Sequence, residues 1–160
     1  EHVGPVYIRL AREATPIVTT DTTPFEIGKA HVYLKREDHH EKNVGIIASG
    51  TIMHHAMRAA KELNESGIGA SVMNLATIKP LDTDALKAYA ADHHVLITVE
   101  EHQVAGGMGS AVSEYLSEHW PIKIVRLGVH DQFGQSGEPE ELLAHYGIDQ
   151  KAIVKAARDA

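Results

Sequence analysis

Residues 44–50, Val-Gly-Ile-Ile-Ala-Ser-Gly, are the stretch that decides the fold. They form a short apolar run that ends at a glycine, which is typical of a strand buried on both faces. Apolar residues then recur at helical spacing until Gly67 ends the pattern. These residues are Ile52, Ala56, Ala59, Ala60 and Leu63. A strand followed at once by a helix predicts a βα unit.

The same alternation continues to the end of the chain. It predicts strands over 44–49, 70–75, 95–100 and 121–127, and helices over 52–66, 82–92, 106–119, 138–146 and 149–157. A short strand over 31–34 is joined to the strand at 44–49 by a polar turn, so we expect these two to pair in antiparallel.

This order predicts an α/β fold. We expect a doubly wound, mostly parallel five-stranded sheet with one antiparallel edge strand and helices on both faces. In such sheets, ligands bind at the carboxyl ends of the strands.

The first 28 residues differ from the rest. Val6, Ile8 and Leu10 alternate with other residues, which indicates a strand. A strand with nothing before it is a poor start for a domain, so we assign residues 1–13 to the tail of a domain upstream. The alternative is that this strand extends the edge of the main domain's own sheet. The prolines and threonines of 14–28 are typical of a linker, which leaves 29–160 as the main domain.

The composition narrows the class of protein. The chain has 160 residues, of which 43% are hydrophobic and 23% charged, as in a soluble globular domain. Its formal net charge of -7 argues against a nucleic-acid partner. The absence of cysteine excludes disulfides and thiolate chemistry. No apolar run approaches the roughly 20 residues that cross a bilayer, so we expect no membrane contact and a cytoplasmic location.

Two segments near strand ends could carry chemistry. Residues 106–110, Gly-Gly-Met-Gly-Ser, open a predicted helix, where backbone N–H groups can bind an anion. They match neither the dinucleotide fingerprint nor a P-loop, and we favour glycines that let the helix start close to the sheet. Glu100, Glu101 and His102 could be an acid–base group. Adjacent strand residues point to opposite faces, so we expect one carboxylate to cap a helix terminus instead.

The histidines do not form a recognisable site. The chain has 12 of them, including the doublets 39–40, 54–55 and 93–94. Doublets point their rings in different directions, and no metal-binding spacing accompanies them, so we expect surface positions and no metal site. No serine nucleophile motif is present either. The residues alone predict an α/β domain without a self-contained active site.

Five segments, taken in order, resemble one family. They are Ala48-Ser49-Gly50-Thr51, Ile78-Lys79-Pro80-Leu81-Asp82, Val99-Glu100-Glu101-His102, residues 106–112 and residues 131–137. This set resembles the C-terminal domain of transketolases, including the C-terminal section that is a separate subunit in some prokaryotes. The resemblance covers nearly the whole chain.

The resemblance implies a function for the complete protein. Transketolases use thiamine diphosphate and a divalent cation, Mg, to move a two-carbon ketol unit between sugar phosphates. The cofactor lies between two domains that precede this one, so the resemblance implies no catalytic, cofactor-binding or metal-binding residue on this chain. We expect the chain alone to be inactive and to bind no thiamine diphosphate. Residues 4–12 resemble the end of the pyrimidine-binding domain, so 1–13 would be its tail, and Arg12 matches an arginine that grips the substrate phosphate.

The resemblance also implies partners and a candidate ligand site. We expect contact with the upstream transketolase domains or an N-terminal subunit, and a homodimer. The candidate regulatory ligand site consists of Gly50, Thr51, Glu100, His102 and Gly107. The alternatives are the last domain of 1-deoxyxylulose-5-phosphate synthase, that of a 2-oxoacid dehydrogenase β-subunit, or a stand-alone module for dimerisation or small-molecule sensing.

Overall fold

The chain forms a five-stranded sheet in a computed structural model that describes residues 3–11, 14–36 and 42–160. The strands are β1 (His31–Leu34), β2 (Asn43–Ala48), β3 (Gly69–Asn74), β4 (Val95–Gln103) and β5 (Lys123–Val129). Their order across the sheet is β1-β3-β2-β4-β5. β2 to β5 are mutually parallel, and β1 runs antiparallel to β3. The predicted fold class is confirmed.

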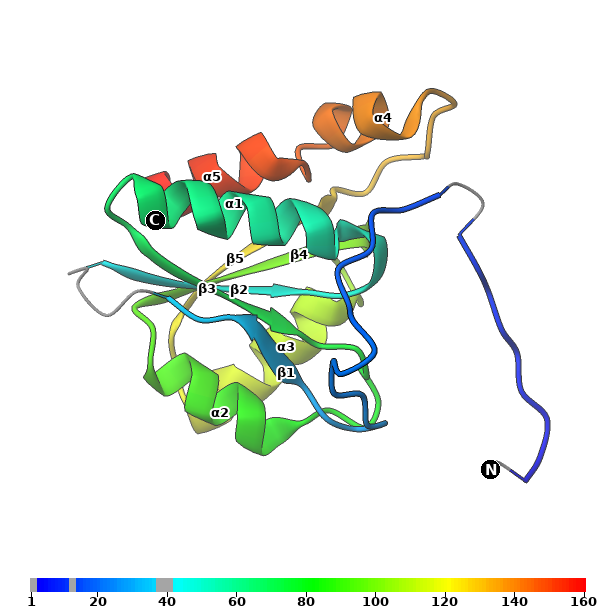
Figure 1. The fold of residues 1–160 in the computed structure, drawn as a ribbon, viewed down its shortest axis with the longest axis horizontal. Helices are drawn as coiled ribbons and strands as arrows, with labels where there is room; N and C mark the ends of the chain where they lie inside the picture. The colour runs from blue at the N-terminus through cyan, green and yellow to red at the C-terminus, as the bar shows by residue number, and fades with distance from the viewer. Residues whose placement is uncertain (1–2, 12–13, 37–41) are drawn as a thin grey trace.

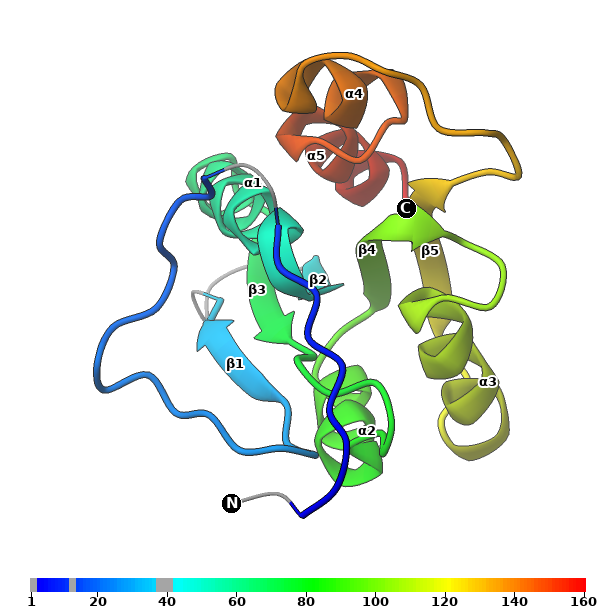
Figure 2. The ribbon, with the colours of Figure 1, turned by 90° about the vertical axis from the view of Figure 1, so that its right-hand side faces the viewer.

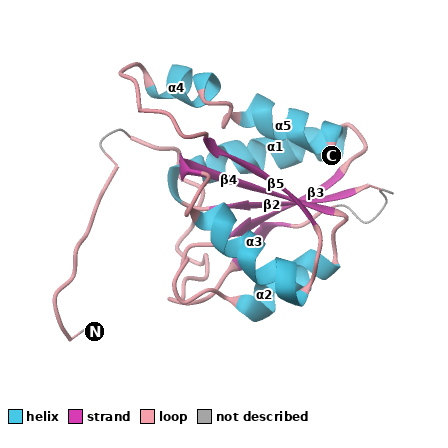
Figure 3. Ribbon diagram, turned by 180° about the vertical axis from the view of Figure 1, so that it is seen from behind, coloured by secondary structure: helices cyan, strands magenta, loops and turns pink. Residues whose placement is uncertain are grey.

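Helices cover both faces of the sheet (Figure 1). One face carries α1 (Met53–Glu65), which follows the short 3₁₀ helix η1 (Gly50–Ile52), together with α5 (Gln150–Asp159). The opposite face carries α2 (Thr83–Ala91) and α3 (Met108–His119), as the view from behind shows (Figure 3). The short helix α4 (Pro139–His145) lies beyond the carboxyl ends of the strands. No helix among these described residues is long and apolar enough to span a bilayer.

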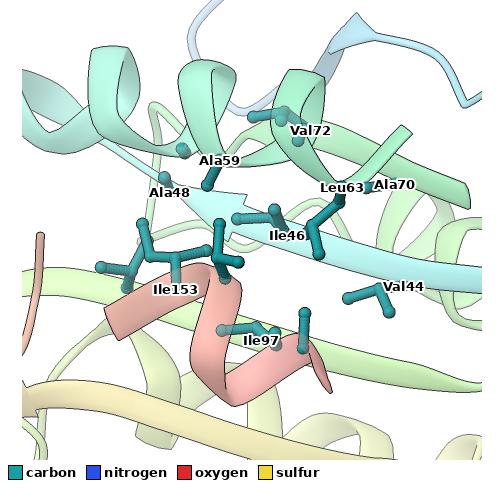
Figure 4. Close-up of a cluster of buried hydrophobic side chains, with 14 of the residues drawn as sticks. Val44, Ile46, Ala48, Ala59, Leu63, Ala70, Val72, Ile97 and Ile153 are labelled. Atoms are coloured by element: carbon teal, nitrogen blue, oxygen red, sulfur yellow. The ribbon is translucent and has the colours of Figure 1, made fainter. Parts of the chain in front are cut away.

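Each face of the sheet has its own core. Ile46 of β2 packs beneath α1 and α5 with Ile97 and Ile153 (Figure 4). The next residue, Ile47, points to the other face and packs beneath α2 and α3 with Leu86 and other apolar side chains. Both isoleucines are completely buried. The apolar run at 44–49 is therefore a strand buried on both faces, as expected.

Local signals set several helix ends. Asp82 caps α2, because its carboxylate accepts a hydrogen bond from the Ala85 N–H at 3.2 Å. The second Asp82 oxygen accepts from the Ala30 N–H at 3.0 Å and ties the entry of β1 to this helix. Asp149 caps α5 in the same way, through the Ala152 N–H at 2.8 Å. Each cap satisfies a backbone donor that a helix start leaves without an intrahelical partner.

The antiparallel strand has a different neighbour from the one predicted. β1 is antiparallel, but it pairs with β3, where His31 lies opposite Asn74, and not with β2. β2 already has β3 on one side and β4 on the other, so both of its edges are used. The prediction was wrong because it took neighbours in sequence as neighbours in the sheet.

The predicted strand at 6–10 is also absent. Residues 3–11 form no helix or strand, and Leu10 is 83% exposed. In Figure 1 this segment runs away from the sheet on the right-hand side. The edge beside β3 is occupied by β1, so among the described residues segment 6–10 does not extend this sheet. Among the described residues, segment 6–10 has no neighbouring strand with which it could pair.

Candidate functional site

The carboxyl ends of β2 and β4 and the start of α3 enclose the main pocket of the described residues. Its volume is about 710 Å³, and the N-terminal segment lines its outer side through Arg9, Leu10 and Ala11. Figure 2 looks onto this end of the molecule and shows the N-terminal segment crossing in front of it. All members of the candidate regulatory site line the pocket: Gly50, Thr51, Glu100, His102 and Gly107. The structure therefore brings these predicted residues together in one place.

Glu100 fills the inner end of this pocket and caps α3. It is 7% exposed, and its two carboxylate oxygens accept hydrogen bonds from the N–H groups of Met108 at 2.6 Å and Gly109 at 2.8 Å. The negative charge also lies at the positive end of the helix dipole. The prediction that one carboxylate of the pair caps a helix is confirmed, and the carboxylate is Glu100.

Glycine is required at two positions of this helix start, because the backbone there lies very close to side chains of β4. A Cβ on Gly107 would lie 2.3 Å from the Glu100 carboxylate, and a Cβ on Gly109 would lie 2.4 Å from Thr98 Oγ1. Real Cβ atoms do not come this close, so only glycine fits at either position without a shift. The interpretation that these glycines bring the helix start close to the sheet is confirmed.

The described residues do not fit the diphosphate of a thiamine cofactor. A diphosphate at a helix start needs free backbone N–H groups, and at α3 two of them are used by the Glu100 carboxylate. A second carboxylate, Glu101, also lines the pocket and accepts a hydrogen bond from the Thr51 hydroxyl. Two carboxylates disfavour a polyanion, and Arg9 is the one Lys or Arg side chain among the pocket residues.

Two of the histidines expected at the surface are buried. His93 is 8% exposed; its Nδ1–H donates to the Tyr89 carbonyl oxygen at 2.6 Å, and its Nε2 lies 2.7 Å from Ser71 Oγ. Burial is the largest influence on this ring and lowers the pKa of His93. His55 is 4% exposed and lies on the stripe of α1 that also buries Ala59. The i, i+4 spacing of His55 and Ala59 was a signal that could have found it. The doublet at 39–40 lies outside the described residues.

His54, His55 and Glu140 bring three potential metal ligands within 4.8 Å of one another. The two rings of this doublet are close, with centroids 4.1 Å apart, contrary to the expectation that they diverge. However, His55 Nδ1 accepts a hydrogen bond from the Gln150 N–H at 3.3 Å, so the ring proton belongs on Nε2, which lies 3.5 Å from the Glu140 carboxylate. A metal ion on Nε2 would displace that proton. The contacts are better explained as a link between α1, α4 and α5.

The residue implied to grip a substrate phosphate, Arg12, lies outside the described residues. The preceding residues, Arg9 to Ala11, line the pocket.

Comparisons with known proteins point to one family. Residues 33–153 match the family described as "Transketolase, C-terminal domain". Over 158 residues the chain is 39% identical to a putative transketolase C-terminal section of Methanocaldococcus jannaschii, covering 97% of this chain and 48% of that protein. It is also 39% identical over 158 residues to one of the subunits of an apulose-4-phosphate transketolase from Phocaeicola vulgatus, covering 98% of this chain and 49% of that protein.

A solved structure agrees with these matches. The chain is similar to a split-gene transketolase, described as an inactive β4 tetramer, with a TM-score of 0.85 and 40% sequence identity. The likeness covers 93% of this chain and 47% of that one. The chain thus spans about half the length of these relatives.

Proposed function

The chain belongs to the transketolase C-terminal domain family, and we propose that it is the C-terminal domain of a thiamine-diphosphate-dependent enzyme that transfers two-carbon ketol units between sugar phosphates. The observation that carries this proposal is the 39% identity, over nearly the whole chain, to a transketolase C-terminal section. The pattern of relatives supports it, because they include a subunit of a split enzyme as well as a section.

We propose that this domain is inactive alone. The thiamine diphosphate and Mg would be held by domains upstream of this one, or by a separate N-terminal subunit, in a homodimer in the cytoplasm. The geometry of Glu100 supports this division of labour, since its carboxylate takes the N–H groups of α3 that a diphosphate could otherwise use.

Two further roles are proposed for residues of this chain. Arg12 would bind the phosphate of the sugar substrate, because a guanidinium offers a planar pair of donors that suits phosphate oxygens. Gly50, Thr51, Glu100, His102 and Gly107 would surround a regulatory ligand. Because Glu100 is committed to α3 and the Thr51 hydroxyl donates to Glu101, the ligand would be bound mainly through His102 and as a donor to Thr51 Oγ1. It would lie between the domain and the N-terminal segment.

A second candidate has a specific observation in its favour. The chain is 34% identical over 156 residues to the 1-deoxy-D-xylulose-5-phosphate synthase of Hamiltonella defensa, covering 96% of this chain and 24% of that protein. A C-terminal domain of such a synthase is therefore the alternative to a transketolase domain.

One experiment separates these functions. The chain is joined to its upstream domains, or mixed with its N-terminal subunit, and assayed with and without thiamine diphosphate and Mg. We expect ketol transfer between sugar phosphates that depends on the cofactor, and no activity from the 160-residue chain alone. Synthesis of 1-deoxyxylulose 5-phosphate instead of ketol transfer would establish the alternative. Calorimetry on the chain alone should show no binding of thiamine diphosphate, and micromolar binding would overturn the assignment of this domain.

A further inference from the structure

Phe133 is an exposed aromatic side chain on a loop with a fixed backbone. It lies in the connection between β5 and α4, and it is 95% exposed. Single apolar residues on a protein surface are common, so exposure alone says little. Phe133 differs from an ordinary exposed residue because hydrogen bonds hold the backbone of its loop on both sides.

Two side chains hold the loop on either side of Phe133. Gln103, at the end of β4, accepts a hydrogen bond from the Asp131 N–H at 2.9 Å and donates one to the Gln132 carbonyl at 3.1 Å. The Tyr146 hydroxyl donates to the Phe133 carbonyl at 3.2 Å and accepts from the Gln135 N–H at 2.9 Å.

This arrangement is suited to binding. Asp131 also has a left-handed φ of 47°, which costs energy for a residue other than glycine. A loop that is already ordered loses little entropy when it binds, and an aromatic side chain is the usual anchor of a protein interface.

The loop lies next to the main pocket. Gln103 directly follows the pocket residues Glu101 and His102 on β4. Glu101 also lines a second hollow of about 310 Å³, whose other residues are Val129, Gly137, Pro139, Leu142, Leu143, Tyr146 and Ile148. The two hollows therefore share Glu101, and the loop begins directly after Val129, which lines the second hollow at the end of β5.

The N-terminal segment leaves the molecule at this same end. The loop and residues 3–11 both lie on the right-hand side of Figure 1, which faces the viewer in Figure 2. Within this segment Val6 is 64% exposed, Ile8 72% and Leu10 83%. Two segments that are far apart in sequence thus expose apolar side chains at one end of the domain.

We propose that Phe133 is the anchor by which this domain docks on the domain that precedes it in a longer subunit. This rests on the proposed function, which places cofactor-binding domains upstream of this one. The relatives are about twice as long as the part that this chain matches, so each of them has a second half that lies outside the match. A domain joined through the N-terminal segment is held at this end at high effective concentration, and it would exclude a second copy of the chain from the surface.

The first test measures whether Phe133 becomes covered. Hydroxyl-radical footprinting compares the 160-residue chain with a longer subunit in which the upstream domain precedes it. Trp120 is an internal control: it is 41% exposed, and it follows α3 just before β5 begins, at the opposite end of the strands. We expect oxidation of Phe133 to fall at least fivefold in the longer subunit, and oxidation of Trp120 to be unchanged. Equal oxidation of Phe133 in both proteins would overturn the proposal.

The second test measures whether Phe133 holds the domains together. Phe133→Ser in the longer subunit should speed protease cleavage within linker 14–28 about tenfold, whereas Trp120→Ser should not. In the chain alone, Phe133→Ser should leave the melting temperature unchanged, because the side chain is exposed. An unchanged cleavage rate in the longer subunit contradicts the proposal.

Two further outcomes are distinguishable. Protection of Phe133 in the chain alone, rising with protein concentration, would identify a second copy as the occupant and overturn the proposal. Ketol transfer is assayed on the same longer subunit. Transfer without protection of Phe133 refutes the docking and leaves the proposed function standing, whereas protection without transfer supports the docking and refutes the function.

Discussion

Glu100 Oε2 lies 2.6 Å from the backbone nitrogen of Met108, so a side chain of the protein supplies the anion at the start of α3. In many α/β proteins a bound phosphate occupies this position at the carboxyl end of a strand. Here the position is structural. The glycine-rich segment 106–110 opens a helix at a place where an anion could bind, but it serves to bring that helix close to its own sheet.

The first prediction concerns Glu100 itself. Glu100→Ala removes two hydrogen bonds to a charged acceptor and leaves buried N–H groups without a partner. We expect a loss of about 3 kcal/mol in the free energy of unfolding. The exposed neighbour Glu101 is the control, and Glu101→Ala should cost less than about 1 kcal/mol. Urea unfolding of the two variants measures both, and equal losses would show that the cap does not stabilise the fold.

The second prediction concerns the glycines of the same helix start. Gly107→Ala places a methyl group 2.3 Å from the Glu100 carboxylate, so we expect it to destabilise the chain by about 1–3 kcal/mol. Gly134→Ala is the matched control, because nothing lies within 4 Å of the added carbon there. Its melting temperature should equal that of the original chain. A similar drop for both variants would point to a general cost of replacing glycine and not to the contact.

The sequence predicts those parts of the fold that depend on nearby residues. The helix expected over 82–92 begins at a local cap, because Asp82 and its N–H donor, Ala85, are three residues apart. The apolar run predicted at 44–49 forms a strand with both faces buried. This was predictable because apolar residues follow one another without alternation, so neither face of the strand is suited to water. The opposite directions of neighbouring strand residues predict that one carboxylate of the Glu100–Glu101 pair caps a helix. That it is Glu100 depends on a helix that starts eight residues later.

Features that depend on distant residues are not predictable in this way. The neighbour of β1 is fixed by how the chain crosses between strands, and neither strand's own sequence contains that information. Val6, Ile8 and Leu10 have the alternation of a strand but no partner strand among the described residues. His93 is buried because the Tyr89 carbonyl and the Ser71 hydroxyl lie within reach of its two nitrogens, and Ser71 lies on a different element.

The third prediction concerns pH. Burial lowers the pKa of His93 from its ordinary 6.5, so in the folded chain the ring stays neutral at pH values where the unfolded chain is protonated. The folded state is therefore favoured above pH 6.5, and this stability is lost as the pH falls from 6.5 toward the lowered pKa. One group contributes a slope of at most about 1.4 kcal/mol per pH unit.

The measurement is urea unfolding between pH 5 and 7. Stability should fall as the pH falls, and His93→Gln should reduce that slope whatever its effect at pH 7. His54, whose pKa is lowered chiefly by burial and by the neighbouring His55, should supply part of the remaining slope.

The fourth prediction tests Arg12 in the complete enzyme. Arg12→Ala should raise KM for phosphorylated sugars by about 10- to 150-fold, which corresponds to the loss of about 1.5–3 kcal/mol from one charge-assisted contact. Cofactor binding and activity toward unphosphorylated donors should be nearly unchanged. Arg9→Ala is the comparison and should have the smaller effect. If Arg12→Ala lowers activity equally for both kinds of donor, Arg12 is a structural residue.

The place of β1 at the border of the sheet has a consequence for aggregation. This strand has only four residues and a register irregularity, and it covers a β3 whose residues 69–73 are buried. Short, irregular border strands are a common protection against intermolecular pairing, because they offer little straight backbone to another chain. A version of the protein that began at residue 43 would leave β3 open. Val72 and Met73 would then lie on a bare strand that could recruit other copies, so the segment leading into the domain also shields β3 from pairing with another chain.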